Sequence, residues 1–548
     1  MNFLEEIFAQ AEKAADVAVL QRRGEHGTAQ VTGGELLRLV GRARSFLAGR
    51  GLHKGDRCVL LAPNSIRWVA IDLAIMAEGL IVVPLYARQA PAELVAMMKD
   101  CSPALICCGD TALRTFITEQ WPEAPAPFLL DDIFLTRWSE TAKPQLEDSD
   151  PVTIIYTSGT SGESKGVVLT AGNVGHMLGC TASRLDALMG HRDRRDRVFH
   201  YLPFCFAASW ITLLTCLLRR SCVTLNTDLA RLAKEMPSAS PDYFLNVPAL
   251  LERMRKAVEE QLAQKGGVGL AIYKRAKRAW ERRQRGRKKL GDFAWTALAN
   301  LLVFPAIRKK MVGSNLEALI CGSAPLGVET QLYFMMLGIP VLQGYGLTET
   351  TGICTLDDPQ HAVPGRVGPA VSGVEMKRGE NDEILVRGPN IFSGYWNRPE
   401  ETARVLRDGW FHTGDQGEVD ATGNWRIVGR LKNLIILGSG HNIAPEPIEE
   451  AVLRHLPDAQ HVVLVGNGRG YLAAIVTGKM RSAAVQAALD QVNPELPHYK
   501  QVRAFYVHRE PFSIENGLLT ANGKLKRDAI AGELKSAIDE IYRVKQAS

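Results

Sequence analysis

A loop rich in hydroxyl groups and glycine ends in a lysine, within Tyr156-Thr-Ser-Gly-Thr-Ser-Gly-Glu-Ser-Lys-Gly-Val167. Glycine adopts left-handed backbone angles at little steric cost, so its N–H groups can approach an anion closely. The hydroxyl groups add short hydrogen-bond donors, and the lysine adds a positive charge. This composition predicts a clamp for phosphate groups, formed by Thr157, Ser158, Gly159, Thr160, Ser161, Gly162 and Lys165.

The surroundings of this loop distinguish it from a Walker phosphate loop. Apolar residues 152–155 precede it and residues 167–169 follow it, which predicts a β-hairpin. A Walker loop requires Gly-Lys followed by Ser or Thr at the start of a helix. Here Lys165 lies between Ser164 and Gly166, and β-branched residues follow. The pattern therefore disfavours an ordinary P-loop NTPase, and a surface hairpin without a ligand is the alternative for this loop taken alone.

A second loop, Gly344-Tyr-Gly-Leu-Thr-Glu-Thr-Thr-Gly352, follows an apolar run and includes Gly346. Tyr345 could stack on a base, and Thr348 could donate a hydrogen bond to a phosphate. Glu349 could hold Mg²⁺ that bridges phosphate oxygens, because this ion prefers oxygen ligands. Either loop alone could be a simple turn, but two such loops in one chain indicate a nucleotide site.

Three further charged residues follow glycine-containing turns. Asp415, in Gly409-Trp-Phe-His-Thr-Gly-Asp415, could accept hydrogen bonds from both hydroxyls of a ribose. Arg430 could add a ribose or phosphate contact. Lys524 follows a glycine in Leu519-Thr-Ala-Asn-Gly-Lys-Leu-Lys-Arg527. Taken singly, the first two would more often be a turn carboxylate and a surface arginine. For Lys524, a solvated basic tail is about as frequent as a functional role.

The elements that must position these residues follow an α/β pattern. Strand-like and helix-like segments alternate along residues 58–108, which indicates βαβ units and a parallel sheet. Further apolar, strand-like runs occur at 243–247, 316–321 and 340–343. We therefore predict a large α/β N-terminal domain with parallel sheets.

The pattern changes in the last third of the chain. Short strands with hairpin turns begin near residue 383 and indicate a β-rich subdomain. A helix-like segment at 446–456 and strands at 462–465 and 471–476 predict a small α+β C-terminal domain. We place the boundary at 430–433, with domains at 1–430 and 431–548.

The composition limits the class of protein. The chain has 548 residues, 46% of them apolar and 23% charged, which is ordinary for a globular protein with several domain-sized units. An acidic start, without a signal pattern or a bilayer-length apolar stretch, predicts a cytoplasmic enzyme. Ten cysteines without a double Cys-x-x-Cys pattern indicate reduced core residues. The net charge of +6 is modest and predicts no nucleic-acid partner.

Much of the positive charge lies in one segment, 274–289, inside a helix-like region that spans 250–311. We favour a solvated helical hairpin for this region. The alternative is peripheral contact with the anionic inner face of a membrane, which suits a basic amphipathic helix.

Taken together, these motifs resemble the adenylate-forming (AMP-binding) superfamily of acyl-CoA synthetases, luciferases and peptide-synthetase adenylation domains. The resemblance extends over about residues 30–535, and the motifs occur in the same order. It implies an acid–thiol ligase that uses ATP and Mg²⁺ to convert a carboxylic acid to an acyl-adenylate. Coenzyme A then accepts the acyl group.

The resemblance also implies residue roles. The loop Thr157 to Lys165 would hold the ATP phosphates, and Tyr345, Asp415 and Arg430 would keep the nucleotide contacts proposed above. Thr348, Glu349 and Lys524 would be catalytic, with Lys524 at the forming acyl-phosphate bond. The segment beside adenine and the acyl carboxylate would comprise Gly322, Ser323 and Ala324, and the hinge and thiol path would comprise Lys432, Ser439 and Gly440.

Within the superfamily, the segment Tyr243 to Arg253 and the helical insertion after it are most similar to long-chain fatty acyl-CoA synthetases. We therefore expect a medium- or long-chain fatty acid as substrate. The alternatives are an acyl-AMP ligase that loads an acyl carrier protein, a ligase for an aryl acid, and a non-catalytic nucleotide-binding protein. Phe206 stands where many relatives have histidine, so this position does not identify the acyl chain of the substrate. A soft acyl lining, or ordinary core packing, is expected of Phe204, Phe206, Ala207, Ala208 and Trp210.

Overall fold

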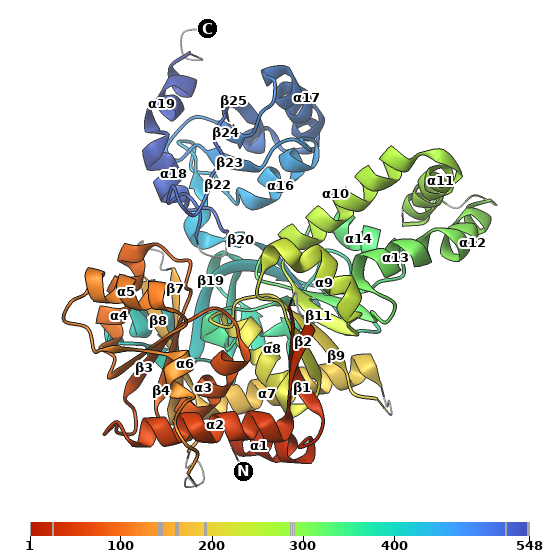
Figure 1. The fold of residues 1–548 in the computed structure, drawn as a ribbon. Coiled ribbons are helices and arrows are strands. Elements are labelled where there is room, and N and C mark those ends of the chain that lie inside the picture. Colours follow the sequence, from red (N-terminus) through yellow and green to blue (C-terminus); the bar gives the residue numbers. More distant parts are fainter. Residues whose placement is uncertain are drawn as a thin grey trace.

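The computed structural model has a large body, a small body above it and a helical arm that projects to one side (Figure 1). The structure describes residues 2–24, 27–139, 146–158, 164–190, 194–284, 286–287, 289, 291–520 and 523–544.

The first large sheet has seven strands in the order β17-β8-β7-β4-β3-β5-β6. The strands β3 (Arg57–Leu61), β4 (Ile81–Leu85), β5 (Leu105–Cys108), β6 (Pro127–Leu129) and β7 (Pro151–Ser158) are parallel, as expected from apolar runs buried on both faces. The helices α3 (Ile66–Ala77), α4 (Pro91–Cys101) and α5 (Thr111–Gln120) alternate with strands of this sheet. At one edge, β8 (Ser164–Thr170) pairs antiparallel with β7 and then with β17 (Gly394–Tyr395), which confirms the predicted hairpin.

The second large sheet has eight strands in the order β14-β13-β12-β11-β9-β10-β1-β2. Its parallel strands include β9 (Arg197–His200), β10 (Cys222–Leu225), β11 (Tyr243–Asn246), β12 (Ala318–Cys321) and β13 (Val341–Tyr345). The chain start also enters this sheet: β1 (Ala18–Gly24) is parallel to β10 and antiparallel to β2 (Gly27–Thr32). The other edge strand is β14 (Thr355–Leu356).

Helices connect and cover these strands. The helices α1 (Phe3–Lys13), α2 (Gly33–Ala48), α3, α7 (Ala171–Met189) and α8 (Ala207–Leu218) contribute buried residues to one large apolar core, together with strands of both sheets. A second core forms around α9 (Leu232–Ala239) and α14 (Val328–Met336). The two sheets thus form one packed α/β body, and this confirms the predicted fold class.

A smaller, antiparallel sheet follows and positions two of the predicted site residues. It comprises β15 (Glu375–Arg378), β16 (Glu383–Arg387), β18 (Leu406–Arg407), β19 (Trp410–Val419) and β20 (Trp425–Arg430), and α15 (Pro399–Val405) precedes β18. The register of β19 and β20 places Asp415 opposite Arg430.

A 3-10 turn, η4 (Leu431–Asn433), leads from β20 into the small body. There β21 (Ile435–Ile436) pairs with β22 (Asn442–Ile443), and a second sheet contains β23 (His461–Val465), β24 (Leu472–Thr477) and β25 (Val502–His508). The helices are α16 (Glu446–Arg454), α17 (Ser482–Val492), α18 (Arg527–Glu533) and α19 (Lys535–Val544). Two apolar clusters of its own fill this α+β unit.

The arm of Figure 1 consists of α10 (Pro248–Lys265), α11 (Gly267–Gln284), α12 (Asp292–Leu302) and α13 (Phe304–Val312). It confirms the helical region expected between residues 250 and 311. In the part of the chain that the structure describes, no helix combines the length and apolarity needed to cross a membrane.

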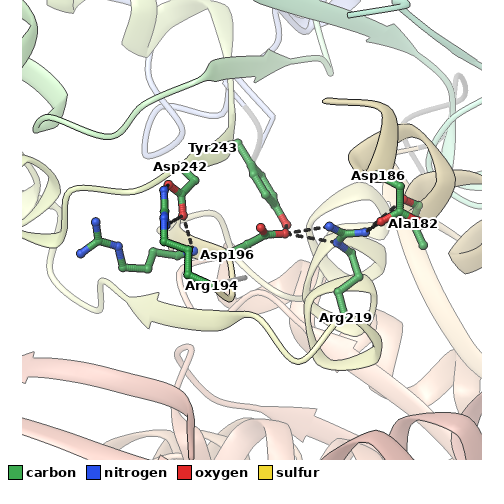
Figure 2. Close-up of polar contacts among 8 residues, drawn as sticks. Ala182, Asp186, Arg194, Asp196, Arg219, Asp242 and Tyr243 are labelled. Carbon is green, nitrogen blue, oxygen red and sulfur yellow. Dashed lines mark hydrogen bonds and ion pairs between the residues drawn. The ribbon is translucent and has the colours of Figure 1, made fainter. Parts of the chain in front are cut away.

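A buried polar network lies at the amino ends of β9 and β11 (Figure 2). Asp242 accepts hydrogen bonds from Arg194 Nη1 at 2.8 Å and from the backbone N–H of Arg197 at 2.7 Å. Asp196 accepts from Arg219 Nη2 at 2.9 Å, and the same guanidinium also pairs with Asp186. Asp242 stabilises the charged form of Arg194 and so raises its pKa above the ordinary value. Burial lowers the pKa of Arg219, but its two carboxylate partners outweigh burial and the pKa is raised there too.

Candidate active site

The candidate site begins at the carboxyl ends of β12 and β13, where parallel sheets commonly bind ligands. Gly322 follows β12, and a Cβ atom at this position would lie 3.2 Å from the carbonyl oxygen of Gly344 on β13. Ser323 adopts a left-handed backbone angle, φ 72°, which is uncommon for a residue with a side chain. Ser323 and Ala324 are exposed. The predicted segment therefore exposes only short side chains directly beside the loop of Tyr345 and Gly346.

The loop after β13 is tightly packed at its glycine and is joined to the β-rich sheet by its tyrosine. A Cβ atom at Gly346 would lie 2.4 Å from the Cα atom of Ile353, so the position requires glycine. Tyr345 is buried, and its hydroxyl donates a 2.8 Å hydrogen bond to Asp415 Oδ2. Burial and the neighbouring carboxylate hold the pKa of this hydroxyl well above its usual value. Thr348 is half-buried and opens the 3-10 turn η2 (Thr348–Thr350).

Asp415 lies at the centre of the site and is 3% exposed. Its Oδ1 atom lies 2.9 Å from Arg430 Nε, in addition to the Tyr345 contact on Oδ2. Burial raises the pKa of Asp415 above its usual value, although Arg430 and Tyr345 act in the opposite direction. Each carboxylate oxygen has two acceptor positions. The group therefore keeps capacity for the hydroxyls of a ligand.

Glu349, the predicted metal ligand, is held in place by two hydrogen bonds. Its Oε1 atom accepts a 2.8 Å hydrogen bond from the Tyr395 hydroxyl, and its backbone oxygen accepts from the Phe392 N–H at 2.9 Å. These contacts fix the half-buried carboxylate. No group of three or more His, Cys, Asp or Glu suited to a metal ion occurs among the described residues. The donor set therefore fits Mg²⁺ that takes most of its oxygen ligands from phosphate and water.

Lys165 points toward the same region from the hairpin edge. Its ammonium group forms an ion pair with Glu401 and lies 5.3 Å from the centre of the Tyr395 ring. Thr157 lies opposite Lys165 in the β7–β8 register. Four residues of the predicted clamp, Gly159, Thr160, Ser161 and Gly162, lie outside the described residues, as does the side chain of Ser158. Only the two ends of the clamp are thus described.

Lys524 reaches the site from the small body. It retains contact with solvent, yet protein atoms crowd the space around its ammonium group. This crowding lowers the pKa of Lys524, and Arg430 lowers it further, whereas Asp415 and Glu349 act in the opposite direction. The charges that act on Lys524 thus come from β19, β20 and the loop after β13. Residues nearly two hundred positions apart therefore share one site.

The predicted hinge and thiol-path residues lie differently. Lys432, in η4, retains contact with solvent, but protein atoms crowd its ammonium group, and this crowding and Arg430 lower its pKa. Ser439 and Gly440 are exposed in the loop between β21 and β22, where Ser439 Oγ lies 2.9 Å from His441 Nδ1. The adjacent Gly438 N–H donates to the Arg469 carbonyl oxygen within the small body. In this arrangement Lys524, rather than Ser439 and Gly440, interacts with Asp415 and Glu349.

The site is rich in positive charge. Lys165, Arg430, Lys432 and Lys524 influence one another or the same carboxylates, which are Glu349, Asp415 and Glu401. Asp528 also acts on Lys432, so four cations lie with four carboxylates here. Cations gathered in this way suit a polyphosphate.

Sequence reasoning missed Tyr395 and Glu401, which hold Glu349 and Lys165. They lie in Gly394-Tyr-Trp-Asn-Arg-Pro-Glu-Glu401, on β17 and α15. This segment lacks the glycine and hydroxyl cluster that drew attention to the other loops. Its only signal is an aromatic residue followed by several charges.

The residues considered for an acyl lining divide into two groups. Phe204 and Trp210 are fully buried core residues: Phe204 packs 5.0 Å from the Trp68 ring, and Trp210 donates a 2.9 Å hydrogen bond to Asp72. These contacts agree with core packing for the two residues. Ala207 is also buried. Phe206 and Ala208 are half-buried, and a Cβ atom on Gly352 would lie 3.2 Å from the Ala208 Cα atom.

Comparison with known proteins agrees with this geometry. The long-chain-fatty-acid–CoA ligase FadD15 of Mycobacterium bovis is 27% identical over 98% of this chain and 96% of its own length. Long chain acyl-CoA synthetase 3 of Arabidopsis thaliana is 25% identical over 90% of this chain and 84% of its own. The o-succinylbenzoate CoA synthetase of Bacillus subtilis, solved with its acyl-adenylate intermediate, has the same fold, with a TM-score of 0.76, 21% identity and coverage of 96% and 97%.

Family profiles match most of the sequence. The profile described as AMP-binding enzyme matches residues 7–396, and the one described as AMP-binding enzyme C-terminal domain matches residues 432–546. Both matches agree with the motifs and with the resemblance drawn from them. The chain belongs to the AMP-binding enzyme family.

Proposed function

We propose that this protein joins a medium- or long-chain fatty acid to coenzyme A through an acyl-adenylate. The observation that carries the proposal is the position of Lys524, which comes from the small body yet interacts with Asp415 and Glu349. An adenylate-forming enzyme needs such an arrangement, because nucleotide, metal and reacting carboxylate must meet at one cationic point. Long-chain fatty acids are the substrates named for the relatives from Mycobacterium bovis and Arabidopsis thaliana.

In the first step, a carboxylate oxygen of the acid attacks the α-phosphorus of ATP. The bond from that phosphorus to the oxygen bridging the β-phosphate breaks, and pyrophosphate leaves with the electron pair. Lys524 would stabilise charge near the forming bond, while Lys165 and the clamp from Thr157 to Gly162 would bind the departing pyrophosphate. Glu349 would hold Mg²⁺, which neutralises phosphate charge when bound. Asp415, Tyr345 and Arg430 would position the nucleoside.

In the second step, the thiolate of coenzyme A attacks the carbonyl carbon of the acyl-adenylate, and the bond to AMP breaks. The thiol proton passes to solvent before attack. We assign residues 1–430 to a domain that binds ATP and the acid, and residues 431–548 to a mobile lid. Rotation of the lid at Lys432 would withdraw Lys524 and bring Ser439 and Gly440 toward the site, since a single hinge can absorb a large backbone change.

The test is carboxylate-dependent exchange of pyrophosphate into ATP, measured across fatty and aryl acids. The expected result is exchange with saturated acids of medium or long chain, followed by acyl-CoA formation on addition of coenzyme A. Exchange with aryl acids alone would show that the substrate is an aryl acid rather than a fatty acid. Transfer only to an acyl carrier protein would replace the acceptor, and no exchange with any acid would overturn the proposal.

We also propose that the helical arm contacts an anionic membrane surface, as a peripheral partner of the enzyme. On α12, an exposed stripe at helical spacing contains Phe293, Ala294, Ala297 and Leu301, and Phe293 and Leu301 are 77% and 74% exposed. Beside it, Arg275 of the basic helix α11 lies 4.4 Å above the Trp295 ring. Apolar side chains flanked by basic ones are typical of helices that lie at a lipid surface.

Vesicle co-sedimentation tests this contact. We expect binding to vesicles that contain phosphatidylserine, weaker binding to pure phosphatidylcholine, and loss of binding in the variant F293D/L301D. Leu135→Asp is the matched control, because Leu135 is 80% exposed outside the arm. Equal sedimentation with both vesicles, or an equal loss in the control variant, would contradict the proposal.

A further inference from the structure

An ion pair joins the two bodies beside the candidate site. Lys526 Nζ, in the small body, lies 3.0 Å from Glu93 Oε1 on α4 of the large body. The other oxygen of Glu93 accepts a hydrogen bond from Gln89 Nε2 at 2.5 Å. Glu93 lies in the first turn of α4, where the helix dipole favours a negative charge. The carboxylate is therefore fixed in place before Lys526 approaches it.

Lys526 and Lys524 belong to one short hairpin. Leu519 bridges Leu525 in antiparallel fashion, and the Thr520 N–H donates to the Lys524 carbonyl at 2.8 Å. The Lys526 N–H donates to the Leu518 carbonyl at 2.9 Å. In extended backbone, residues two apart project to the same side. Both lysines therefore face the large body, and movement of one carries the other with it.

The base of this hairpin is fixed to the small body. Arg527 donates from Nη1 to Glu449 Oε1 at 2.7 Å and from Nη2 to Glu449 Oε2 at 2.5 Å. Glu449 on α16 also accepts from the Leu464 N–H at 2.6 Å. Such a bidentate pair is geometrically rigid. The position of Lys526 is thus fixed relative to the small body, so a contact made by Lys526 constrains the orientation of that body.

We infer that Lys526 is a positioning residue, which pairs with Glu93 to hold the small body in the orientation that places Lys524 at the site. The inference rests on the proposed two-step function and adds to it the contact that favours the first orientation. The pair is partly exposed, with side-chain exposures of 32% for Lys526 and 39% for Glu93, so it is weak and readily broken. A weak contact suits an orientation that must be abandoned once in each reaction cycle.

Charge reversal separates this role from a general structural one. We expect Lys526→Glu and Glu93→Lys each to slow pyrophosphate exchange about fivefold, the upper range for a partly exposed pair. The double variant K526E/E93K, which restores the pair with opposite signs, should recover exchange to within about twofold. Thioester formation from supplied acyl-adenylate and coenzyme A should be unchanged or faster in the single variants. Lys535→Glu, an exposed charge change on α19, is the control expected to change neither step.

A readout independent of activity accompanies these rates. In the variant E93C/K526C, we expect a short bis-maleimide to crosslink positions 93 and 526 within one chain, and the crosslinked protein should retain exchange but lose thioester formation. Equal losses in both steps, or no recovery in the charge swap, would overturn the inference. Absence of the crosslink would overturn it even in a protein that shows exchange. Absence of exchange in the unmodified protein would instead overturn the proposed function, and the crosslink would still report the contact.

Discussion

Charged residues lie at both ends of the strands in the eight-stranded sheet, but their pairing differs. At the amino ends of β9 and β11, Asp196 and Asp242 are paired with Arg219 and Arg194 from the same body (Figure 2). At the carboxyl ends of β12 and β13, Lys524 comes from a separate body and acts on Asp415 and Glu349 together with Arg430 and Lys432.

Buried carboxylates thus have two different roles in the large body. Asp242 accepts hydrogen bonds from two guanidinium nitrogens and one backbone N–H, so three of its four acceptor positions serve to hold the chain together. Asp415 has a raised pKa, because burial outweighs its partners. A buried carboxylate that its protein partners do not fully stabilise is typical of a ligand-binding site.

Removing the Lys524 ammonium group should impair the candidate site and leave the folded structure intact. We expect Lys524→Ala to slow adenylate formation about 100- to 1,000-fold, because a charge aimed at the developing transition state is lost. Thiol attack on supplied acyl-adenylate should change little, and the melting temperature should not fall. Both half-reactions and a thermal melt measure this, with Lys535→Ala as control. Equal slowing of the two half-reactions would show that Lys524 does not act in the first step alone.

Breaking the ion pairs at the amino ends of β9 and β11 should lower stability and leave the rate unchanged. Asp242→Ala leaves Arg194 and the Arg197 N–H without their acceptor, and we expect a loss of about 3 kcal/mol in stability. The rate of the enzyme that remains folded should stay near normal. Urea unfolding checks this against Glu375→Ala, whose partner Arg387 is half exposed and which should cost less than about 0.5 kcal/mol. A lower rate with unchanged stability would place Asp242 in the site instead.

Asp415→Asn sharpens the contrast between the two carboxylates. We expect the KM for ATP to rise about thirtyfold, because a charged acceptor for the ribose hydroxyls becomes a neutral one. Stability at neutral pH should not fall, since the raised pKa of Asp415 shows that its ionised form is costly in the folded protein. Steady-state kinetics and a thermal melt decide this. A marked fall in melting temperature would mean that Asp415 is a scaffold residue like Asp242.

Asp72 represents a third kind of buried carboxyl, and the effect expected of it is the smallest. Burial raises its pKa from 3.8 to about 7, and only its hydrogen bond from Trp210 opposes this. Because the folded-state pKa lies above the unfolded value, this group favours folding at low pH, and the benefit is lost as the pH rises through about 7. We expect the stability difference between Asp72→Asn and the unmodified protein to shift in favour of the variant by on the order of 2 kcal/mol from pH 4 to pH 8.

Urea unfolding at a series of pH values measures this difference. A constant difference across the range would contradict the raised pKa. Asp357→Asn is the companion variant, because burial raises the pKa of Asp357 to about 7 as well. Its difference from the unmodified protein should change with pH in the same direction.

Much of the fold follows from local sequence. The apolar runs at 58–61, 81–85 and 243–247 match β3, β4 and β11 closely, because strands buried on both faces need nearly continuous apolar sequence. The hairpin at Lys165 was also predictable from the two β-branched runs that flank it. The entry of β1 into the second sheet was not, since nothing near residue 20 specifies a partner at residue 223.

The candidate site shows the same division. Glycine, hydroxyl and charged residues at close spacing identified the loops, because close backbone approach to a phosphate demands these residue types. The partners of those residues could not be read in this way. Glu401 for Lys165, Tyr395 for Glu349 and Glu93 for Lys526 come from elements whose positions only the tertiary fold determines.

The position of β1 between β10 and β2 also bears on how the protein is made. Leu20 pairs with Val223, so the partner is synthesised 203 residues after the strand itself. During translation β1 can pair with β2 at once, but its other edge stays open until β10 has left the ribosome. Pairing across such a distance is slow, and open strand edges favour aggregation. The second sheet can therefore close only late in synthesis, and until then the free edge of β1 is open to pairing with other chains.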